Sequence, residues 1–362
     1  MSSARERRLA TLLERLVAGH LDAVLVTSLP NIRYLTGFSG SNALLLVTGR
    51  DAHLVTDFRY QTQAATESGD VCNVRVETSN LWSGLWSLMG GLAGVQSVGF
   101  ESAHLPHRDF QRLMERGERW HWRPVTDLVE GLRAQKDAEE VAHIRTAGAM
   151  AIRALHETLE RVRIGMTELE VCGILEHALR DAGSEAHPFA PIVASGPRSA
   201  LPHARASGRA IAPGEFLLLD FGASTGGYCS DVTRTVILGR ADERQRAIHE
   251  AVREANRVAR EGIRAGMRGR EGDALARSVL ESRGLGELFG HGLGHGIGLE
   301  VHEAPRLSRL AEEVLPEGSV VTIEPGVYVP EWGGVRIEDD VHLGADGADL
   351  LTDFTRELLV LS

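Results

Sequence analysis

The chain is poor in cysteine, and this limits the classes of protein it can belong to. Its 362 residues include only three cysteines, Cys72, Cys172 and Cys229, which are odd in number and form no CxxC pair. A disulfide-stabilised secreted protein would carry a richer, evenly paired set. The cysteine content therefore fits a reducing compartment, and we expect a cytoplasmic protein.

Long hydrophobic runs and an excess of positive charge are also lacking. No apolar run reaches the roughly 20 residues that a membrane-spanning helix needs. The Arg-rich N-terminus has no apolar segment typical of a signal peptide. The formal net charge is −11, which would not attract nucleic acid. We therefore expect neither a membrane nor a nucleic-acid partner, and bound cations would neutralise part of the charge.

The length and the pattern of elements predict two domains. Residues 1–130 alternate short apolar strands with helical stretches, as in a small α/β domain. Residues 131–362 open with a long amphipathic helix and mix further helices, over about 167–181 and 243–265, with strands and glycine-containing turns. This second part is predicted to be an α+β domain.

Two aspartates lie at the facing ends of neighbouring predicted strands. Asp220 ends one apolar run, Asp231 opens the next, and residues 223–227 between them have the composition of a turn. A turn centred on Thr225-Gly226 would put the aspartates directly opposite each other, with Cβ atoms roughly 4.5–5.5 Å apart. A turn centred on Gly226-Gly227 would make them diagonal neighbours on the same face. Either register brings together two carboxylates that would repel unless a cation lay between them.

Three more residues follow the same logic. His295 lies in the glycine-rich segment 291–298, where the backbone can approach a site closely. Glu324 ends a strand-like run, and Glu338 follows a second glycine-containing turn. Four carboxylates and one imidazole suit ions such as Mn²⁺, Co²⁺ or Zn²⁺. Spacing alone leaves open that these residues are turn formers, caps or loop residues.

Five segments resemble, in the same order, the metal-site motifs of the pita-bread metallopeptidases. They are residues 218–222, 228–235, 294–303, 322–326 and 336–339. The likeness covers nearly the whole chain and is greatest to the Xaa-Pro branch, aminopeptidase P and prolidase. It implies a pita-bread catalytic domain over 131–362, in which helices flank a curved antiparallel sheet. It also implies a creatinase/prolidase-type N-terminal domain over 1–130, whose signatures residues 31–38 and 56–60 resemble.

The resemblance implies roles for nine residues. Two divalent ions about 3.5–4 Å apart, with Mn²⁺ expected and Co²⁺ or Zn²⁺ as alternatives, would be held by Asp220, Asp231, His295, Glu324 and Glu338. Glu324 would also carry the proton from the attacking water to the leaving nitrogen. Contacts to a proline-containing peptide are expected from His203, His291, His302 and Arg336. Of these, His203 and His302 would assist catalysis by stabilising the developing oxyanion. All four also admit a purely structural interpretation, in which Arg336 pairs with a carboxylate.

The function implied is hydrolysis of an Xaa-Pro bond, with two alternatives for the length of the substrate. An aminopeptidase P releases the first residue of longer peptides, whereas a prolidase cleaves Xaa-Pro dipeptides and must bind a free proline carboxylate. We favour the aminopeptidase because Arg336 could be committed to neighbouring carboxylates. Arg198 and Arg205 flank His203. Either could bind the proline carboxylate instead, so the prolidase alternative stays open.

Two more distant alternatives are a non-catalytic peptide-binding module on the same fold and a methionine aminopeptidase. The intact ligand set argues against the first, and the additional N-terminal domain argues against the second. The resemblance also leads us to expect a homodimer, in which the N-terminal domain rims the active site of the partner.

Overall fold

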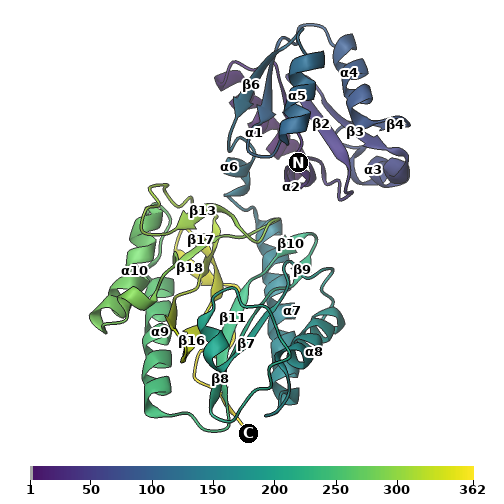
Figure 1. Cartoon of the computed structure of the whole chain (residues 1–362). Helices are drawn as coiled ribbons and strands as arrows, with labels where there is room; N and C mark the ends of the chain where they lie inside the picture. Colours follow the sequence, from purple (N-terminus) through teal and green to yellow (C-terminus); the bar gives the residue numbers. More distant parts are fainter. Residues whose placement is uncertain (1–2) are drawn as a thin grey trace. The chain divides into compact units, whose positions relative to one another are not determined.

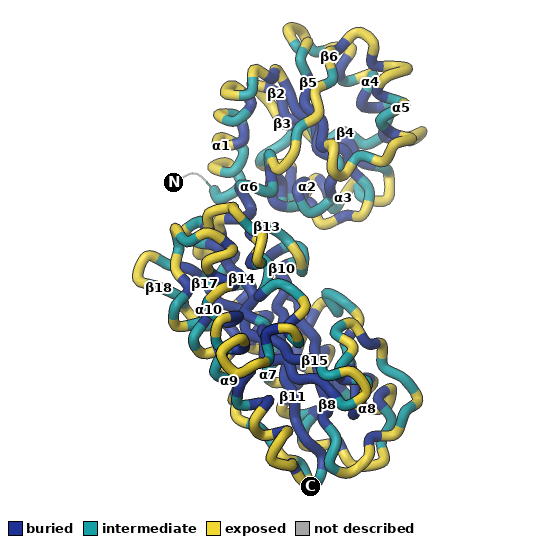
Figure 2. The backbone as a smooth tube through the Cα atoms, turned by 60° about the vertical axis from the view of Figure 1, so that its left-hand side comes forward, coloured by how far each residue is buried: buried dark blue, intermediate teal, exposed yellow. Residues whose placement is uncertain are grey.

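The structure is a computed structural model that describes residues 3–362. Its contacts divide the chain into two compact units, Met1–Arg133 and Ala134–Ser362 (Figure 1). The most deeply buried backbone follows the strands of each unit (Figure 2). Each unit therefore has a core of its own.

The N-terminal unit is built on one six-stranded sheet in the order β4-β3-β2-β1-β5-β6. Its strands are β1 (Ala23–Val26), β2 (Ala43–Thr48), β3 (Ala52–Asp57), β4 (Asn73–Glu77), β5 (Ser97–Glu101) and β6 (His121–Val125). Its helices are α1 (Ala4–Ala18), α2 (Leu29–Thr36), η1 (Phe58–Tyr60), α3 (Gln61–Ser68), α4 (Leu81–Gly91), α5 (His107–Arg116) and α6 (Glu130–Arg133). Strands β1 and β2 are buried throughout, as continuous apolar runs between covered faces should be. The small α/β domain predicted from the sequence is present.

The second unit has four long helices, α7 (Ala138–Arg161), α8 (Glu168–Asp181), α9 (Glu243–Gly262) and α10 (Gly269–Ser282). Helices α7, α8 and α9 each begin with a capping box, in which the cap side chain and the third helical residue bond reciprocally. Helix α9 ends at Gly262, earlier than predicted. Gly266 then turns the chain at a φ of 86°, and α10, which the sequence did not reveal, follows at once.

Two larger sheets, two short hairpins and two helical turns make up the rest of this unit. The first runs β19-β11-β8-β7, with β7 (Ile192–Ser195), β8 (Glu215–Phe221), β11 (Val232–Leu238) and β19 (Val360–Leu361). The second runs β13-β12-β14-β17-β18, with β12 (Gly294–Gly296), β13 (Glu303–Leu307), β14 (Val320–Ile323), β17 (Asp339–Gly344) and β18 (Gly347–Leu350). Two short hairpins are β9 (Ser224–Thr225) with β10 (Tyr228–Cys229), and β15 (Gly326–Val329) with β16 (Gly333–Arg336). Short helical turns are η2 (Gly196–Ala200) and η3 (Gly286–Leu288).

An isolated β-bridge links the two sheets. Thr233 of β11 pairs with Glu338, which directly precedes β17, and the Glu338 amide donates to the Thr233 carbonyl at 3.1 Å. One hydrophobic cluster packs α9 and α10 against this region, and another packs α7 and α8 against it. The α+β architecture expected for this part of the chain is confirmed, and the junction of the sheets is enclosed between helices.

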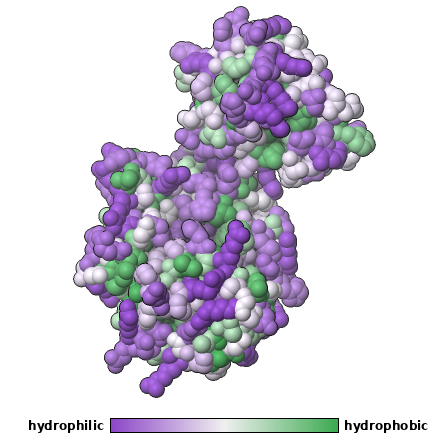
Figure 3. Space-filling view, viewed as in Figure 1, coloured by the Kyte–Doolittle hydropathy of each residue, from purple (hydrophilic) through white to green (hydrophobic). Residues whose placement is uncertain are grey.

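The outer surface is predominantly polar on the face drawn in Figure 3, where hydrophobic residues occur as scattered patches. Within residues 3–362, no helix combines the length and the apolar character required to cross a membrane.

Candidate metal centre

The β8–β11 hairpin places the first two carboxylates. Its register pairs Asp220 with Thr233, and at the tip Thr225 pairs with Tyr228. The turn is therefore centred on Gly226-Gly227, the second of the two registers considered. Both glycines have positive φ, 59° and 81°, as a two-residue turn between twisted strands requires. Asp231 lies two residues before the partner of Asp220, in the diagonal position.

The β15–β16 hairpin places the two glutamates. Its register pairs Gly326 with Arg336, and beyond its open end the Ile337 amide donates to the Pro325 carbonyl at 3.4 Å. Continued by one more residue on each strand, this register brings Glu324 and Glu338 opposite each other. The glycine-containing turn recognised in the sequence thus delivers both acidic side chains to one place.

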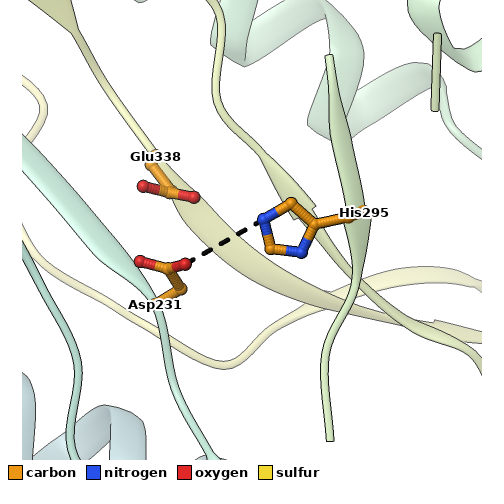
Figure 4. A group of neighbouring side chains, drawn as sticks. All are labelled: Asp231, His295 and Glu338. Atoms are coloured by element: carbon orange, nitrogen blue, oxygen red, sulfur yellow. Dashed lines mark ion pairs between the residues drawn. The ribbon is translucent and has the colours of Figure 1, made fainter. Parts of the chain in front are cut away.

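His295 enters from β12, and glycine before it allows the close approach of the strands. A Cβ on Gly294 would lie 2.0 Å from the Thr322 carbonyl oxygen. The Nε2 atom of His295 lies 3.5 Å from Oε1 of Glu324 and 4.0 Å from Oδ2 of Asp231. One ligand atom each from Asp231, His295 and Glu338 lies within 4.8 Å of the others (Figure 4).

The electrostatics of this cluster favour bound cations. Burial, reinforced by the neighbouring carboxylates, raises the pKa of Asp231 and of Glu324 well above the ordinary values. The same causes raise the pKa of Glu338 to about 8, with Asp220 the main neighbour. Oδ1 of Asp231 is buried and has no hydrogen-bond partner among the described residues. Burial also lowers the pKa of His295 to about 4, which keeps the imidazole in the neutral form that binds metals.

Arg336 lies inside this cluster and is almost fully buried. Its guanidinium donates to Oδ2 of Asp220, to the Tyr328 hydroxyl at 2.7 Å and to Oγ1 of Thr233 at 3.1 Å. Thr233 in turn donates to Oε2 of Glu338 at 2.5 Å. Arg336 thus pairs with a carboxylate, as the structural interpretation of this residue predicts.

Tyr328 was missed in the sequence, although its spacing held a signal. It lies on β15, two residues after Gly326 and four after Glu324, so strand alternation places it on the same side as that glutamate. Its hydroxyl lies 2.9 Å from Nε2 of His291. Burial lowers the pKa of His291 to about 4. His291 therefore borders the centre through a neutral ring held by Tyr328.

The other two predicted histidines lie on the exposed side of the site. The ring of His302 has its centroid 4.2 Å from that of His295. His203 lies in the loop after η2. Burial is the main cause that lowers the pKa of His291 and of His302, and a charge on His203 would lower both further. Both His203 and His302 are exposed. The structure thus groups all four predicted substrate contacts around the carboxylates, with Arg336 turned inwards.

Arg306 is a second residue missed in the sequence. It lies on β13 directly across from His295, and it is exposed. Burial is the main cause that lowers the pKa of His302, and the charge of Arg306 adds a smaller lowering. Among residues 3–362, no carboxylate forms an ion pair with its guanidinium. Sequence spacing could not reveal it, because the register shifts between His295 and Gly296.

Comparison with known proteins agrees with this geometry. The family described as metallopeptidase family M24 matches residues 142–345, more than half of the chain. The chain belongs to this family. Residues 8–135 match the creatinase/prolidase N-terminal domain. Both domain types expected from the motifs are confirmed, and so is the enzyme class, a metallopeptidase.

Individual relatives extend the likeness to the whole chain. An Xaa-Pro dipeptidase of Pyrococcus horikoshii is 38% identical over 341 residues, which cover 94% of this chain and 95% of the relative. An Xaa-Pro dipeptidase structure from Bacillus anthracis superposes with a TM-score of 0.94 at 37% identity, covering 99% and 100% of the two chains. An X-Pro aminopeptidase structure from Thermotoga maritima gives a TM-score of 0.91 at 35% identity, covering 98% and 99%.

Proposed function

We propose that this chain is a metal-dependent Xaa-Pro dipeptidase, a prolidase. This replaces the aminopeptidase P favoured on the sequence alone. The observation that carries the proposal is Arg306, an exposed cation directly across from His295. A dipeptide bound at the metal centre brings a free proline carboxylate that needs such a partner. The relatives from Pyrococcus horikoshii and Bacillus anthracis named above as Xaa-Pro dipeptidases support the same choice.

The five clustered ligands fit two divalent ions. We propose that Asp220, Asp231, His295, Glu324 and Glu338 would together hold these ions. Mn²⁺ is the expected metal, with Co²⁺ and Zn²⁺ as alternatives. When bound, such ions would activate a water molecule and polarise the scissile carbonyl. Arg336 supports this set because it donates a hydrogen bond to Asp220. It also donates to Thr233, which in turn donates to Glu338.

The protein side chains supply the remaining chemistry. Glu324 accepts the proton of the attacking water and delivers it to the proline nitrogen, which has no hydrogen of its own. His203 and His302 donate to the developing oxyanion and to the proline carbonyl oxygen. Arg306 binds the proline carboxylate and so selects substrates that end at proline. His291, held by Tyr328, borders the pocket for the proline ring.

The variant Arg306→Gln tests the proposal. We expect kcat/KM for an Xaa-Pro dipeptide to fall about tenfold or more, since a charged hydrogen bond contributes about 1.5–3 kcal/mol. An Xaa-Pro-Yaa tripeptide should be affected much less. Arg309→Gln is a matched control, because Arg309 is an exposed arginine three residues further on. Equal losses for dipeptide and tripeptide would contradict the assigned role.

Aminopeptidase P remains a second candidate, because the Thermotoga maritima structure named X-Pro aminopeptidase is nearly as similar. Under that alternative the tripeptide would be the better substrate and Arg306→Gln would leave its cleavage unchanged.

We also propose that the protein forms a homodimer and is located in the cytoplasm. Light scattering of the purified protein tests the assembly, and a monomer with full activity would contradict it.

A further inference from the structure

The loop that carries His203 raises a problem of positioning. It connects β7 to β8 and includes η2, and both Leu201 and His203 within it are exposed. An exposed loop is mobile unless its ends and its middle are tied down. A histidine that donates to a reacting oxygen must be held in place, because small displacements cost large factors in rate.

Glu168 ties the two ends of this loop together. It is the first residue of α8 and is completely buried. Oε1 accepts hydrogen bonds from the amide of Ser195 at 2.8 Å and from its hydroxyl at 2.9 Å. Oε2 accepts from the amide of Ser207 at 3.0 Å and from its hydroxyl at 2.6 Å. Ser195 directly precedes η2 and Ser207 lies four residues after His203, so one carboxylate closes the loop.

Arg198 connects the same carboxylate to the middle of the loop. Its Nε lies 3.0 Å from Oε2 of Glu168, and another guanidinium nitrogen donates to the carbonyl of Arg205. Arg205 is two residues from His203. The guanidinium of Arg198 is therefore committed to Glu168 and to the Arg205 carbonyl, which argues against it as the cation for a proline carboxylate.

Two further contacts run from this loop towards the metal centre. The carbonyl of Pro202, the residue before His203, accepts from Nη1 of Arg336 at 3.4 Å. The amide of Gly334 on β16 donates to Oγ of Ser199 at 2.8 Å. A loop closed by Glu168 is thus aligned with the strand that carries Arg336.

The helix does not need the Glu168 side chain for its own stability. Thr167 caps α8, and Glu170 completes the capping box with the Thr167 amide. A buried carboxylate is costly unless many donors compensate it, and the donors to the Glu168 carboxylate, from Ser195, Arg198 and Ser207, lie in the loop or at its ends. The contacts indicate that the Glu168 carboxylate serves to hold the loop and not to stabilise the helix.

We propose that Glu168 is a positioning residue, which holds the 196–207 loop so that His203 faces the reacting peptide. The proposal rests on the proposed function, because the role of His203 in hydrolysis is part of it. Glu168 lies outside the metal centre, and it would affect catalysis only through the position of His203.

The test combines Glu168→Gln with His203→Ala. Glutamine keeps the size of the side chain, but its NH₂ group cannot accept the bonds that one carboxylate oxygen now accepts. We expect Glu168→Gln to retain metal and to lose about tenfold to a hundredfold in kcat. In a His203→Ala background the same change should cost little more, because the residue it positions is already gone. Equal losses in both backgrounds would mean a general structural defect and would overturn the proposal.

Two controls separate the loop from the helix and from the function. Glu170→Gln alters the cap of the same helix and should leave kcat within about twofold. Ser207→Ala removes one donor and should reproduce the effect of Glu168→Gln in weaker form. It keeps the proposal testable if Glu168→Gln itself folds poorly. Hydrogen exchange of residues 196–207 needs no turnover, and we expect it to quicken in Glu168→Gln. Unchanged exchange in that loop would overturn the proposal, whereas an inactive wild type with quickened exchange would overturn only the proposed function.

Discussion

The guanidinium of Arg336 donates a hydrogen bond to Oδ2 of Asp220 inside the candidate metal centre. The same guanidinium bonds Tyr328 and Thr233, so its position is fixed from three directions. A buried arginine beside a group of carboxylates compensates part of their charge and orients one ligand. Arg336 is therefore best understood as support for the candidate metal site, which is why we propose Arg306 for the role at the proline carboxylate.

Arg336→Met should weaken metal binding while the fold is retained. Residues that orient metal ligands typically contribute 10-fold to 100-fold in affinity, and we expect a loss of about that size. Arg336→Lys should recover little, because an ammonium group cannot reproduce the forked geometry of the guanidinium. Competition with a chelator measures the affinity, and unchanged binding in both variants would contradict the role.

Glu324→Gln should lose turnover far more than substrate binding. The change keeps the size of the side chain but removes its basicity, and a general base contributes roughly 10²–10⁴ in rate. The assay is run at saturating metal, with the bound metal counted in each sample. A metal-loaded variant with the kcat of the wild type would refute the proton-transfer role.

Lys136→Met should destabilise the catalytic unit. Lys136 is the only lysine of the chain. Its Nζ lies 2.7 Å from Oε1 of Glu303, with side chains only 1% and 5% exposed. Removing one partner of a buried ion pair costs about 3–5 kcal/mol. Denaturant unfolding measures the loss, and the double variant Lys136→Met/Glu303→Gln should recover part of it. A Lys136→Met protein as stable as the wild type would show that the pair contributes little.

Metal removal should make stability strongly dependent on pH. Burial raises the pKa of Glu338 to about 8 and that of Asp231 and Glu324 well above the ordinary values. A carboxyl group with a raised folded-state pKa holds its proton more tightly when folded. Its contribution is therefore lost as the pH rises from the unfolded pKa towards the folded one. Histidines with lowered pKa values, such as His295, act in the opposite direction, but mainly below about pH 6.5.

The corresponding measurement compares melting temperatures with and without Mn²⁺ at about pH 6.5 and pH 8. The metal-free protein should melt lower at the higher pH, whereas the loaded protein should change little, because its ligands are already deprotonated. The stabilisation by metal should therefore grow with pH. A constant difference between the two forms would show that the carboxylates do not repel as described.

Local patterns in the sequence predicted much of the centre. The turn over residues 223–227 predicted that Asp220 and Asp231 share a face, although the sequence left its register open between two possibilities. The turn before Glu338 predicted the second hairpin. Such features depend on a few neighbouring residues and on strand alternation. Motif resemblance supplied the order of the ligands and both domain types.

Long-range pairings were beyond what the sequence could predict. Arg306 lies across from His295 only because the register between β12 and β13 shifts. Glu168 and the Ser207 it holds are 39 residues apart, and no local pattern links them. Helix α10 was missed because Gly269 and Gly272 weaken the helical signal in its first turn.

The most direct test of the proposed function is the ratio of two kcat/KM values. An Xaa-Pro dipeptide and the matched Xaa-Pro-Yaa tripeptide are compared, with the same first residue and the same metal. We expect the dipeptide to be preferred by about tenfold or more, which corresponds to about 1.4 kcal/mol of transition-state binding. A tripeptide cleaved as well as the dipeptide, or better, would contradict the assignment of a dipeptidase.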